Sequence, residues 1–280
     1  DIKGFFDNVD HGILMKLVRR RISDPRALRL IEGWLKAGVM EEGRFHETTG
    51  VGTPQGGVIS PLLANIYLHY VLDEWFAREV CPRLQGRAYL VRFADDAVMG
   101  FEGERDARRV LEVLPKRFGR YGLTLHPEKT RLVRFLRPPW RDSSKNESGR
   151  RANGSFEFLG FTHYWGRSLR GNWVVKRKTA RSRLSRAVRT IGQWCRQHRH
   201  QPVATQHRTL KQKLQGHYAY YGITGNAPAL RSFYRLVRRL WRKWLGRRSQ
   251  RGLTPWDRYE RQLSRYPLPR PVVVHSVYRP

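Results

Sequence analysis

The amino-acid sequence predicts an α+β fold in its first part and an all-helical, strongly basic region in its second. Two observations support this division. Short runs typical of β-strands alternate with amphipathic helical patterns up to about residue 178, and helical patterns follow from Thr179 onward. Residues 1–140 carry 23 Lys and Arg against 18 Asp and Glu, whereas residues 141–280 carry 32 against 5. We therefore expect two functional regions, 1–178 and 179–280.

The elements of the first region can be placed by periodicity and by capping residues. Asp10 is a candidate N-cap for a helix that starts at His11, and Pro61 suits the first turn of a long helix. A loop rich in Pro, Ser, Asn and Gly is expected at about 137–154. The expected order is strand 2–9, helix 11–22, helix 26–35, hairpin 39–52, helix 60–80, two strands within 88–101, helix 104–123, strand 130–135, and strands at 156–165 and 172–178.

The second region contains amphipathic helices with one apolar face and one basic face. Leu184, Val188 and Ile191 share a helix face, with Trp194 or Cys195 continuing it. A second stripe contains Leu230, Phe233, Tyr234, Val237, Leu240, Trp241 and Trp244. We expect these apolar stripes to form the core rather than base-stacking surfaces. Residues 158–256 contain no acid, so the basic faces would repel one another unless phosphates lie between them.

Composition narrows the class of protein. The net charge of +32 exceeds what solubility requires and favours a polyanionic partner, with nucleic acid as the leading candidate. The aromatic content predicts that the chain folds despite its charge. Cys81 and Cys195 are too far apart in the sequence for a zinc quartet or a disulfide framework, so we expect a reducing compartment and no structural metal. The sequence contains no Ser-His-Asp arrangement, P-loop or membrane-spanning run.

Two adjacent acids, Asp95 and Asp96, interrupt an apolar stretch in RFADDAVMGF. Burying a carboxylate is costly unless a cation compensates it, so the pair is either a solvated turn or a metal site. Asp1 begins another expected strand. Carboxylates from neighbouring strand ends can share a pair of Mg²⁺ ions, which assist phosphoryl transfer.

Five motifs in order decide between these alternatives by resemblance. They are DIKGFFDNVDH (1–11), GTPQGGVISPLLANIYLH (52–69), RFADDAV (92–98), GLTLHPEKT (122–130) and FEFLGF (156–161). This series resembles the palm of group II intron reverse transcriptases, and LKQKLQGHYAYYG (210–222) with the Trp-rich helix after it resembles their maturase domain. The resemblance implies a polymerase palm-type antiparallel sheet with packed helices at 1–178, followed by an all-α basic thumb/maturase domain at 179–280.

The resemblance also implies the catalytic site. Asp1, Asp95 and Asp96 would be the catalytic residues, and with the carbonyl of Ile2 they would hold two Mg²⁺ ions. The family has a fingers region ahead of Asp1 that this sequence lacks. We therefore expect a palm and maturase fragment that is poorly active alone.

Further residues match nucleotide and primer contacts of the family. Phe6 would lie against the sugar, Gln55 with Gly56 against nucleotide and template, and Lys129 near the phosphates. Phe158, Leu159 and Gly160 would grip the primer end. From the residues alone, Phe6 is equally a core residue, Pro-Gln-Gly-Gly a turn, Lys129 a surface lysine and 158–160 part of a strand.

The implied function is an RNA-directed DNA polymerase that extends a primer 3′-hydroxyl with deoxynucleotides and a maturase that binds intron RNA to assist splicing and mobility. The partners would be group II intron RNA, an RNA template, a DNA primer and deoxynucleotides, with no membrane. The alternative is a non-catalytic RNA-binding splicing factor on a polymerase scaffold. A bacterial, nucleoid-associated cytoplasmic location is expected, and an organellar one stays open. The expected RNA-binding residues are Arg177, Lys178, Arg181, Arg186, Arg189, Lys211, Lys213, Arg235, Arg238, Arg239 and Arg242.

Overall fold

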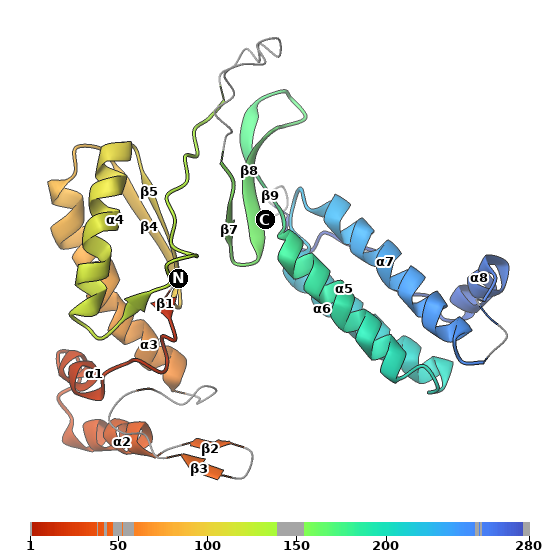
Figure 1. Cartoon of the computed structure of the whole chain (residues 1–280), viewed down its shortest axis with the longest axis horizontal. Helices are drawn as coiled ribbons and strands as arrows, with labels where there is room; N and C mark the ends of the chain where they lie inside the picture. Colours follow the sequence, from red (N-terminus) through yellow and green to blue (C-terminus); the bar gives the residue numbers. More distant parts are fainter. Residues whose placement is uncertain are drawn as a thin grey trace. The chain divides into compact units, whose positions relative to one another are not determined.

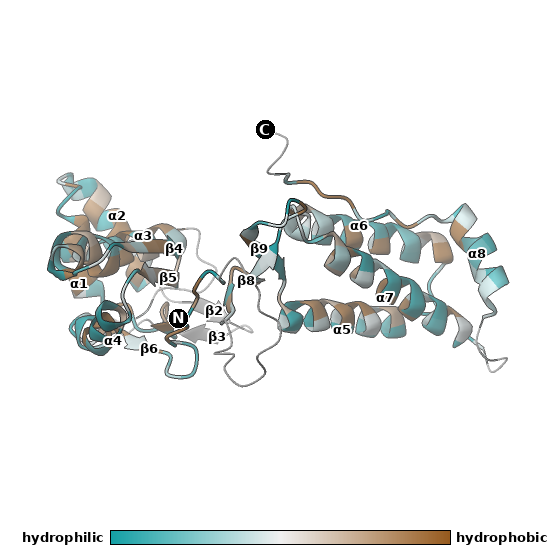
Figure 2. Cartoon of the chain, turned by 90° about the horizontal axis from the view of Figure 1, so that it is seen from above, coloured by the Kyte–Doolittle hydropathy of each residue, from teal (hydrophilic) through white to brown (hydrophobic). Residues whose placement is uncertain are grey.

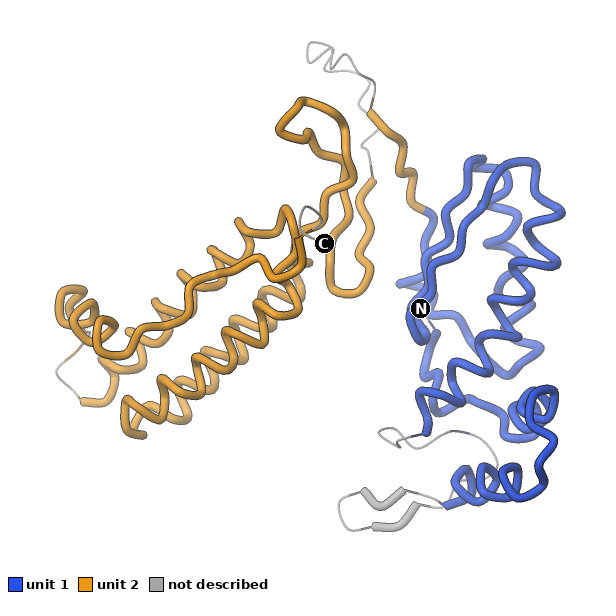
Figure 3. Tube along the Cα trace, turned by 180° about the vertical axis from the view of Figure 1, so that it is seen from behind, with its two compact units in different colours: residues 1–132 blue, residues 133–280 orange. Residues whose placement is uncertain are grey.

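The chain folds into two compact units, residues 1–132 and 133–280 (Figure 3). The computed structural model describes residues 2–37, 39–41, 44–46, 52, 59–138, 154–249, 252 and 254–276. The strands at 156–179 belong to the second unit together with the helices that follow them. The compact units therefore divide at Leu132, and the functional division at residue 178 stays a prediction.

The first unit combines helices with short antiparallel strands, as the sequence predicted (Figure 1). Its helix α3 continues into two π-helical stretches, η1 and η2, and a 3₁₀ turn, η3. The elements are β1 (Ile2–Lys3), α1 (His11–Val18), α2 (Pro25–Lys36), β2 (Val39–Glu41), β3 (Arg44–His46), α3 (Ser60–Leu68), η1 (His69–Glu74), η2 (Phe76–Val80), η3 (Cys81–Arg83), β4 (Ala88–Phe93), β5 (Asp96–Phe101), α4 (Glu104–Gly119) and β6 (Thr124–Leu125).

Side-chain caps start the first two helices. The carboxylate of Asp10 accepts a hydrogen bond from the backbone N–H of Ile13 at 2.7 Å, which confirms Asp10 as the N-cap of α1. Asp24 caps α2 in the same way through the N–H of Arg26. These caps satisfy N–H groups that have no partner within the helix.

Two expected strands differ from the structure. Strand β1 covers only Ile2–Lys3, because Gly4 turns the chain with φ +53° and the Asn8 amide donates to the carbonyls of Lys3 and Gly4. The expectation of a strand at 130–135 was wrong, since these residues have no regular structure. Both runs have strand-like composition, but composition does not supply a pairing partner.

Two separate two-stranded antiparallel sheets lie in the part of the first unit that carries the acids. Strand β1 pairs with β6, with Ile2 opposite Leu125, and β4 pairs with β5, with Phe93 opposite Asp96. Both sheets pack on one core, because Ile2 belongs to it and Leu90 and Met99 lie against it. The fully buried members of that core include Leu14, Leu63, Tyr67, Leu68, Val71 and Leu72.

The second unit joins a three-stranded antiparallel sheet to a helical bundle. The strands are β7 (Phe156–Phe158), β8 (Phe161–Arg167) and β9 (Trp173–Thr179), in the order β7-β8-β9. The single strand expected at 156–165 is thus two strands joined by a turn at Leu159–Gly160. The helices are α5 (Arg181–Gln197), α6 (Val203–Tyr221), α7 (Ala227–Gly246) and α8 (Trp256–Arg265).

The bundle has an apolar interior and a basic exterior, and Figure 2 shows both faces along α5 and α7. Ile191 and Cys195 of α5 are buried, as are Leu230, Phe233, Val237 and Trp241 of α7. This burial confirms that the apolar stripes form a core. Gln206 is the main polar member: its amide donates to the carbonyls of His198 and Gln201, and its oxygen accepts from the Trp241 indole N–H.

Candidate active site

The acids Asp95 and Asp96 lie at a tight hairpin turn between β4 and β5. Phe93 pairs with Asp96, so Ala94 and Asp95 form a two-residue loop. Ala94 has a φ of +53°, and positive φ at the first loop residue alone is the φ pattern of a type II′ turn. Asp95 and Asp96 are both partly exposed. The carboxylates are therefore presented at the tip of a hairpin rather than enclosed in the core.

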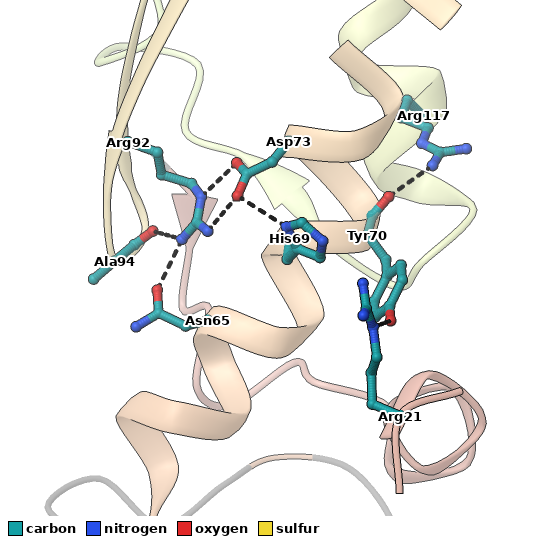
Figure 4. A network of polar contacts seen from close by, with 8 residues as sticks. All are labelled: Arg21, Asn65, His69, Tyr70, Asp73, Arg92, Ala94 and Arg117. Carbon is teal, nitrogen blue, oxygen red and sulfur yellow. Dashed lines mark hydrogen bonds and ion pairs between the residues drawn. The ribbon is translucent and has the colours of Figure 1, made fainter. Parts of the chain in front are cut away.

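Arg92 holds this turn in place (Figure 4). Its guanidinium forms a bidentate ion pair with Asp73 of η1, at 2.7 and 2.6 Å, and donates to the Asn65 side chain of α3 at 2.9 Å. The same guanidinium donates to the carbonyl of Ala94 at 2.9 Å. One side chain thus connects the acid-bearing turn to the helix behind it, in the fork geometry that Arg alone provides.

Sequence reasoning missed Arg92 and Asp73, although β4 contains a signal. Residues Ala88, Leu90 and Arg92 point inward, whereas Tyr89, Val91 and Phe93 point outward with 63, 57 and 65% of their surface exposed. A charged residue in the inward register of a strand requires a buried partner. That register predicts that Arg92 has a partner, but it does not identify Asp73, which lies in a helix.

A side chain from α4 donates hydrogen bonds to backbone carbonyls of the π-helical stretch η1. Arg117 of α4 donates to the carbonyl of Val71 at 3.0 Å and to that of Tyr70 at 3.1 Å. Such stretches leave carbonyls without their usual helical partners and recur at functional sites. The backbone that carries Asp73 is therefore supported from its far side.

Strand β1 brings the first motif toward the hairpin, and Figures 1 and 4 both show β1 beside the end that carries the turn. Asp1 itself lies outside the described residues, so its predicted role stays a prediction. Ile2 is buried and pairs with Leu125. Lys129 is exposed in a turn four residues beyond Leu125, where its N–H donates to the carbonyl of His126. The turn of Lys129 thus directly follows the strand that pairs with β1.

Phe6 and the start of the second motif lie together. Phe6 is partly buried against the core and meets Phe5 edge-on, with ring centroids 5.4 Å apart. The N–H of Gly52 donates to the carbonyl of Val9, and a Cβ at Gly52 would lie 3.4 Å from the carbonyl oxygen of Phe6. Gln55, Gly56 and Gly57 are not among the described residues, but Gly52 anchors the segment that leads to them.

The residues fit a divalent cation by the chemistry of their donors. Asp95 and Asp96 supply hard carboxylate oxygens, which Mg²⁺ prefers, and the carbonyl of Ile2 is a further oxygen donor on β1. In the part of the chain that the structure describes, no three His, Cys, Asp or Glu side chains gather closely enough to hold a metal ion. That part does not include Asp1, so the three-acid site stays a prediction.

The expected primer grip, Phe158–Gly160, is a second tight turn and lies in the second unit. Leu159 and Gly160 have φ of +50° and +75°, the φ pattern of a type I′ turn. The Tyr220 hydroxyl donates to the carbonyl of Leu159 at 3.0 Å, and the N–H of Ala180 donates to that of Gly160 at 2.9 Å. The end of α6 and the start of α5 therefore position this turn.

Asn226 connects the same elements from inside the unit. It is fully buried, accepts from the N–H of Thr179 at 2.9 Å, and donates to the Thr179 hydroxyl at 2.8 Å and to the carbonyl of Tyr221 at 2.7 Å. One amide thus joins the end of β9, the end of α6 and the start of α7. Nothing in its sequence neighbourhood distinguishes it from a loop asparagine.

Two histidines in this unit have depressed pKa values because they are buried. Desolvation lowers the pKa of His217 to about 4, and its ring stacks on Phe233 with centroids 3.8 Å apart. Desolvation also lowers the pKa of His163, which stacks on Phe156. Burial thus disfavours the charged form of both rings, and their stacking contacts make them aromatic packing groups.

The expected RNA-binding residues divide into two groups. Arg238 pairs with Glu260 of α8, and the guanidinium of Arg242 lies 3.9 Å from the ring centroid of Trp256, so both contribute to holding α8 against α7. The others lie on exposed or partly exposed surfaces: Arg177, Lys178, Arg181, Arg186, Arg189, Lys211, Lys213, Arg235 and Arg239. Their contact with RNA stays a prediction.

Among the described helices, none has an apolar stretch long enough to cross a lipid bilayer.

The sequence is similar to known proteins over much of the chain. The family described as Reverse transcriptase (RNA-dependent DNA polymerase) matches residues 1–163. The group II intron-encoded protein LtrA of Lactococcus lactis subsp. cremoris is 36% identical over 148 residues, 49% of this chain and 24% of LtrA. Protein YkfC of Escherichia coli is 36% identical over 167 residues, 47% of this chain and 42% of YkfC. A 91 kDa protein in the cob intron of Schizosaccharomyces pombe is 48% identical over 75 residues, 27% of this chain and 9% of that protein.

The chain matches only part of each of these relatives. The matched part spans about a quarter of LtrA and less than half of YkfC. The family match includes the acid-bearing hairpin and the turn at Leu159–Gly160, and it ends inside β8. The chain therefore belongs to the reverse transcriptase (RNA-dependent DNA polymerase) family, and within that family it resembles the proteins encoded by group II introns.

Proposed function

We propose that the protein is the RNA-directed DNA polymerase and maturase of a group II intron, with Asp95 and Asp96 as catalytic carboxylates. The single observation that carries this proposal is the hairpin tip, where two partly exposed acids are fixed through Arg92 beside β1. The bidentate ion pair of Arg92 with Asp73 ties this turn to the helix, which supports a site that holds its acids in fixed positions. Asp1 and the carbonyl of Ile2 would complete the cation site.

In the proposed reaction, the 3′-hydroxyl of a primer attacks the α-phosphate of a deoxynucleotide, and pyrophosphate leaves. Two Mg²⁺ ions, when bound, would activate the hydroxyl and offset charge on the phosphates. The chain's own residues supply alignment, which is the main contribution of the protein to such transfers. Asp95 and Asp96 would hold the ions, Phe6 would lie against the sugar, and Lys129 would face the leaving phosphates.

The second unit supports the maturase part of the proposal. No acid lies between Phe158 and Trp256, and the basic residues of α5, α6 and α7 are largely exposed. Structured RNA is recognised mainly through its backbone and shape, which suits a broad basic surface. The partners would be intron RNA, an RNA template, a DNA primer and deoxynucleotides. The cellular compartment stays a prediction.

Primer extension tests the catalytic part. The chain is assayed on an RNA template with Mg²⁺, both as given and with the fingers region implied by the resemblance joined before Asp1. Asp95→Ala should abolish extension, because it removes a cation ligand, and should leave intron splicing and RNA binding intact. The exposed acid Asp257 of α8 provides a matched control, and Asp257→Ala should extend primers as the unchanged chain does.

The same assay distinguishes the polymerase from the alternative, a non-catalytic RNA-binding splicing factor. If the unchanged protein with its fingers region binds and splices intron RNA but extends no primer, the chain is an RNA-binding splicing factor on a polymerase scaffold. Extension that survives Asp95→Ala would show that the carboxylate is not catalytic.

A further inference from the structure

A groove in the second unit combines positive charge with an apolar and aromatic floor. It has a volume of about 500 Å³, within the range of small-ligand sites. One wall is α7 and the other is the chain segment 270–273. The residues that line this α7 groove are Ala227, Leu230, Arg231, Tyr234, Arg235, Arg238, Arg270, Pro271, Val272 and Val273.

The second wall is fixed in place by contacts at both ends. The Tyr218 hydroxyl donates to the carbonyl of Pro269 at 3.2 Å, and the N–H of Val274 donates to the carbonyl of Gly222 at 2.7 Å. Both anchors come from α6 and its C-terminus, next to the start of α7. The groove is therefore a built feature of the bundle rather than a gap beside a loose chain end.

Among the described residues, the groove carries more positive charge than its carboxylate partner offsets. Arg231 and Arg235 stand one helical turn apart, where like charges destabilise a helix, and Arg270 faces them from the other wall. In the described part of the unit, the only carboxylate that pairs with a groove residue is that of Glu260, with Arg238. A bound anion would remove this repulsion.

The aromatic and apolar floor of the groove sets a second requirement for its ligand, in addition to negative charge. The ring of Tyr234 lies 5.8 Å from the guanidinium of Arg238, and Pro271 and Val272 provide apolar surface in the groove. An aromatic ring among arginines suits a nucleobase with its phosphates, because each base has a face that can stack and guanidinium groups can pair with phosphates. Bases inside a duplex do not offer that face.

From this geometry we infer that the α7 groove binds an unpaired nucleotide of single-stranded RNA, with the base on Tyr234 and the flanking phosphates on Arg231, Arg235 and Arg270. The inference rests on the proposed RNA-binding function and adds to it a defined contact. It gives the helical unit a means of distinguishing single-stranded segments from duplex.

The test compares a short labelled oligouridine with an abasic oligonucleotide of the same length, by fluorescence anisotropy with the 280-residue chain over a range of salt. Tyr234→Leu should weaken the binding of oligouridine at least about fivefold and leave the binding of the abasic oligonucleotide unchanged. A fivefold loss corresponds to about 1 kcal/mol, because 1.4 kcal/mol changes an affinity tenfold. Arg231→Gln and Arg270→Gln should weaken both ligands, and each should reduce the salt slope by about 0.7.

Arg261→Gln is the matched control, because Arg261 is exposed on α8 and lies outside the groove. Thermal unfolding shows which variants remain folded. If Tyr234→Leu does not fold, the variants Arg231→Gln and Arg270→Gln still test the inference, because both arginines are exposed. Equal binding of oligouridine by Tyr234→Leu and the unchanged chain would overturn the inference. So would an equal loss for both ligands, or tighter binding of an oligoglutamate peptide than of oligouridine. Because no primer extension is measured, a failure here is separate from a failure of the polymerase proposal.

Discussion

The hairpin turns at Ala94 and Leu159 both contain a non-glycine residue with positive φ, and different contacts stabilise each turn. In the described residues, Ala94 and Leu159 are the two non-glycine residues with positive φ, and each begins the loop of a hairpin. A left-handed conformation costs an ordinary residue about 1–2 kcal/mol, so the surroundings must stabilise each turn. The contacts that stabilise each turn differ between the two units.

In the first unit a charged side chain holds the turn. Arg92 connects the Ala94 carbonyl to Asp73 and Asn65, so the acids depend on one guanidinium. In the second unit neutral groups do this work. The Tyr220 hydroxyl and the N–H of Ala180 hold the turn, and Asn226 acts behind them. The difference suits the predicted roles of the two turns. The guanidinium of Arg92 can lie beside Asp95 and Asp96 without competing for the backbone N–H groups of the turn. The neutral groups at the second turn leave the positive charge of that unit available for nucleic acid.

Removing Arg92 should have the largest effect. Arg92→Ala removes the bidentate partner of Asp73, leaves that carboxylate only the longer contact with His69 at 3.7 Å, and frees the Ala94 carbonyl. We therefore expect a loss of about 2–3 kcal/mol in the free energy of unfolding. This lies below the roughly 3–5 kcal/mol of a fully buried pair because Asp73 is 29% exposed. Primer extension should fall by about 10²-fold at temperatures where the variant is folded, since misplaced acids misalign the reacting groups. Denaturant unfolding and extension assays measure the two effects.

Arg87 provides the matched control at the other end of the same hairpin. It pairs with Glu102, and both side chains are more than half exposed. Arg87→Ala should therefore leave stability and extension unchanged, because exposed ion pairs contribute little. Equal losses from Arg87→Ala and Arg92→Ala would mean that any change in the hairpin disturbs catalysis, and Arg92 would have no special role.

The same comparison shows what the sequence could and could not predict. The hairpin at 88–101 and the apolar stripes of α5 and α7 follow from periodicity, and the cap at Asp10 follows from its residue type. Both signals are local, and the structure confirms these predictions. The strand expected at 130–135 is absent, because strand-like composition does not supply a pairing partner. The turn inside 156–161 was missed because its first loop residue is Leu159, a residue type that rarely adopts positive φ. Arg92–Asp73 and Asn226–Thr179 join residues 19 and 47 positions apart, a relationship that no local pattern encodes.

Replacing Asn226 should have the second largest effect and test the neutral arrangement. Asn226→Ala leaves the Thr179 N–H, the Thr179 hydroxyl and the Tyr221 carbonyl without their partner in a buried position. We expect a loss of about 2 kcal/mol in the free energy of unfolding of the second unit. Chemical denaturation of the chain, followed through the Trp residues of the bundle, measures this loss.

Asn172 is the matched control for this change, because its side chain is exposed in the loop between β8 and β9. Asn172→Ala should unfold at the same denaturant concentration as the unchanged chain. A loss below about 1 kcal/mol for Asn226→Ala would show that water replaces the amide, and that the turn at Leu159 depends on Tyr220 and Ala180 alone.

Relieving the strain in the first turn should give the smallest effect, with the opposite sign. Ala94→Gly removes the penalty of the left-handed conformation, and this gain exceeds the entropy that glycine adds to the unfolded chain. We expect a gain of about 0.5–1 kcal/mol in stability, whereas Ala97→Gly, in the regular part of β5, should lose a similar amount. Differential denaturation of the two variants measures both changes. A loss from Ala94→Gly would mean that the turn does not adopt positive φ in solution, and the presentation of Asp95 would then need another explanation.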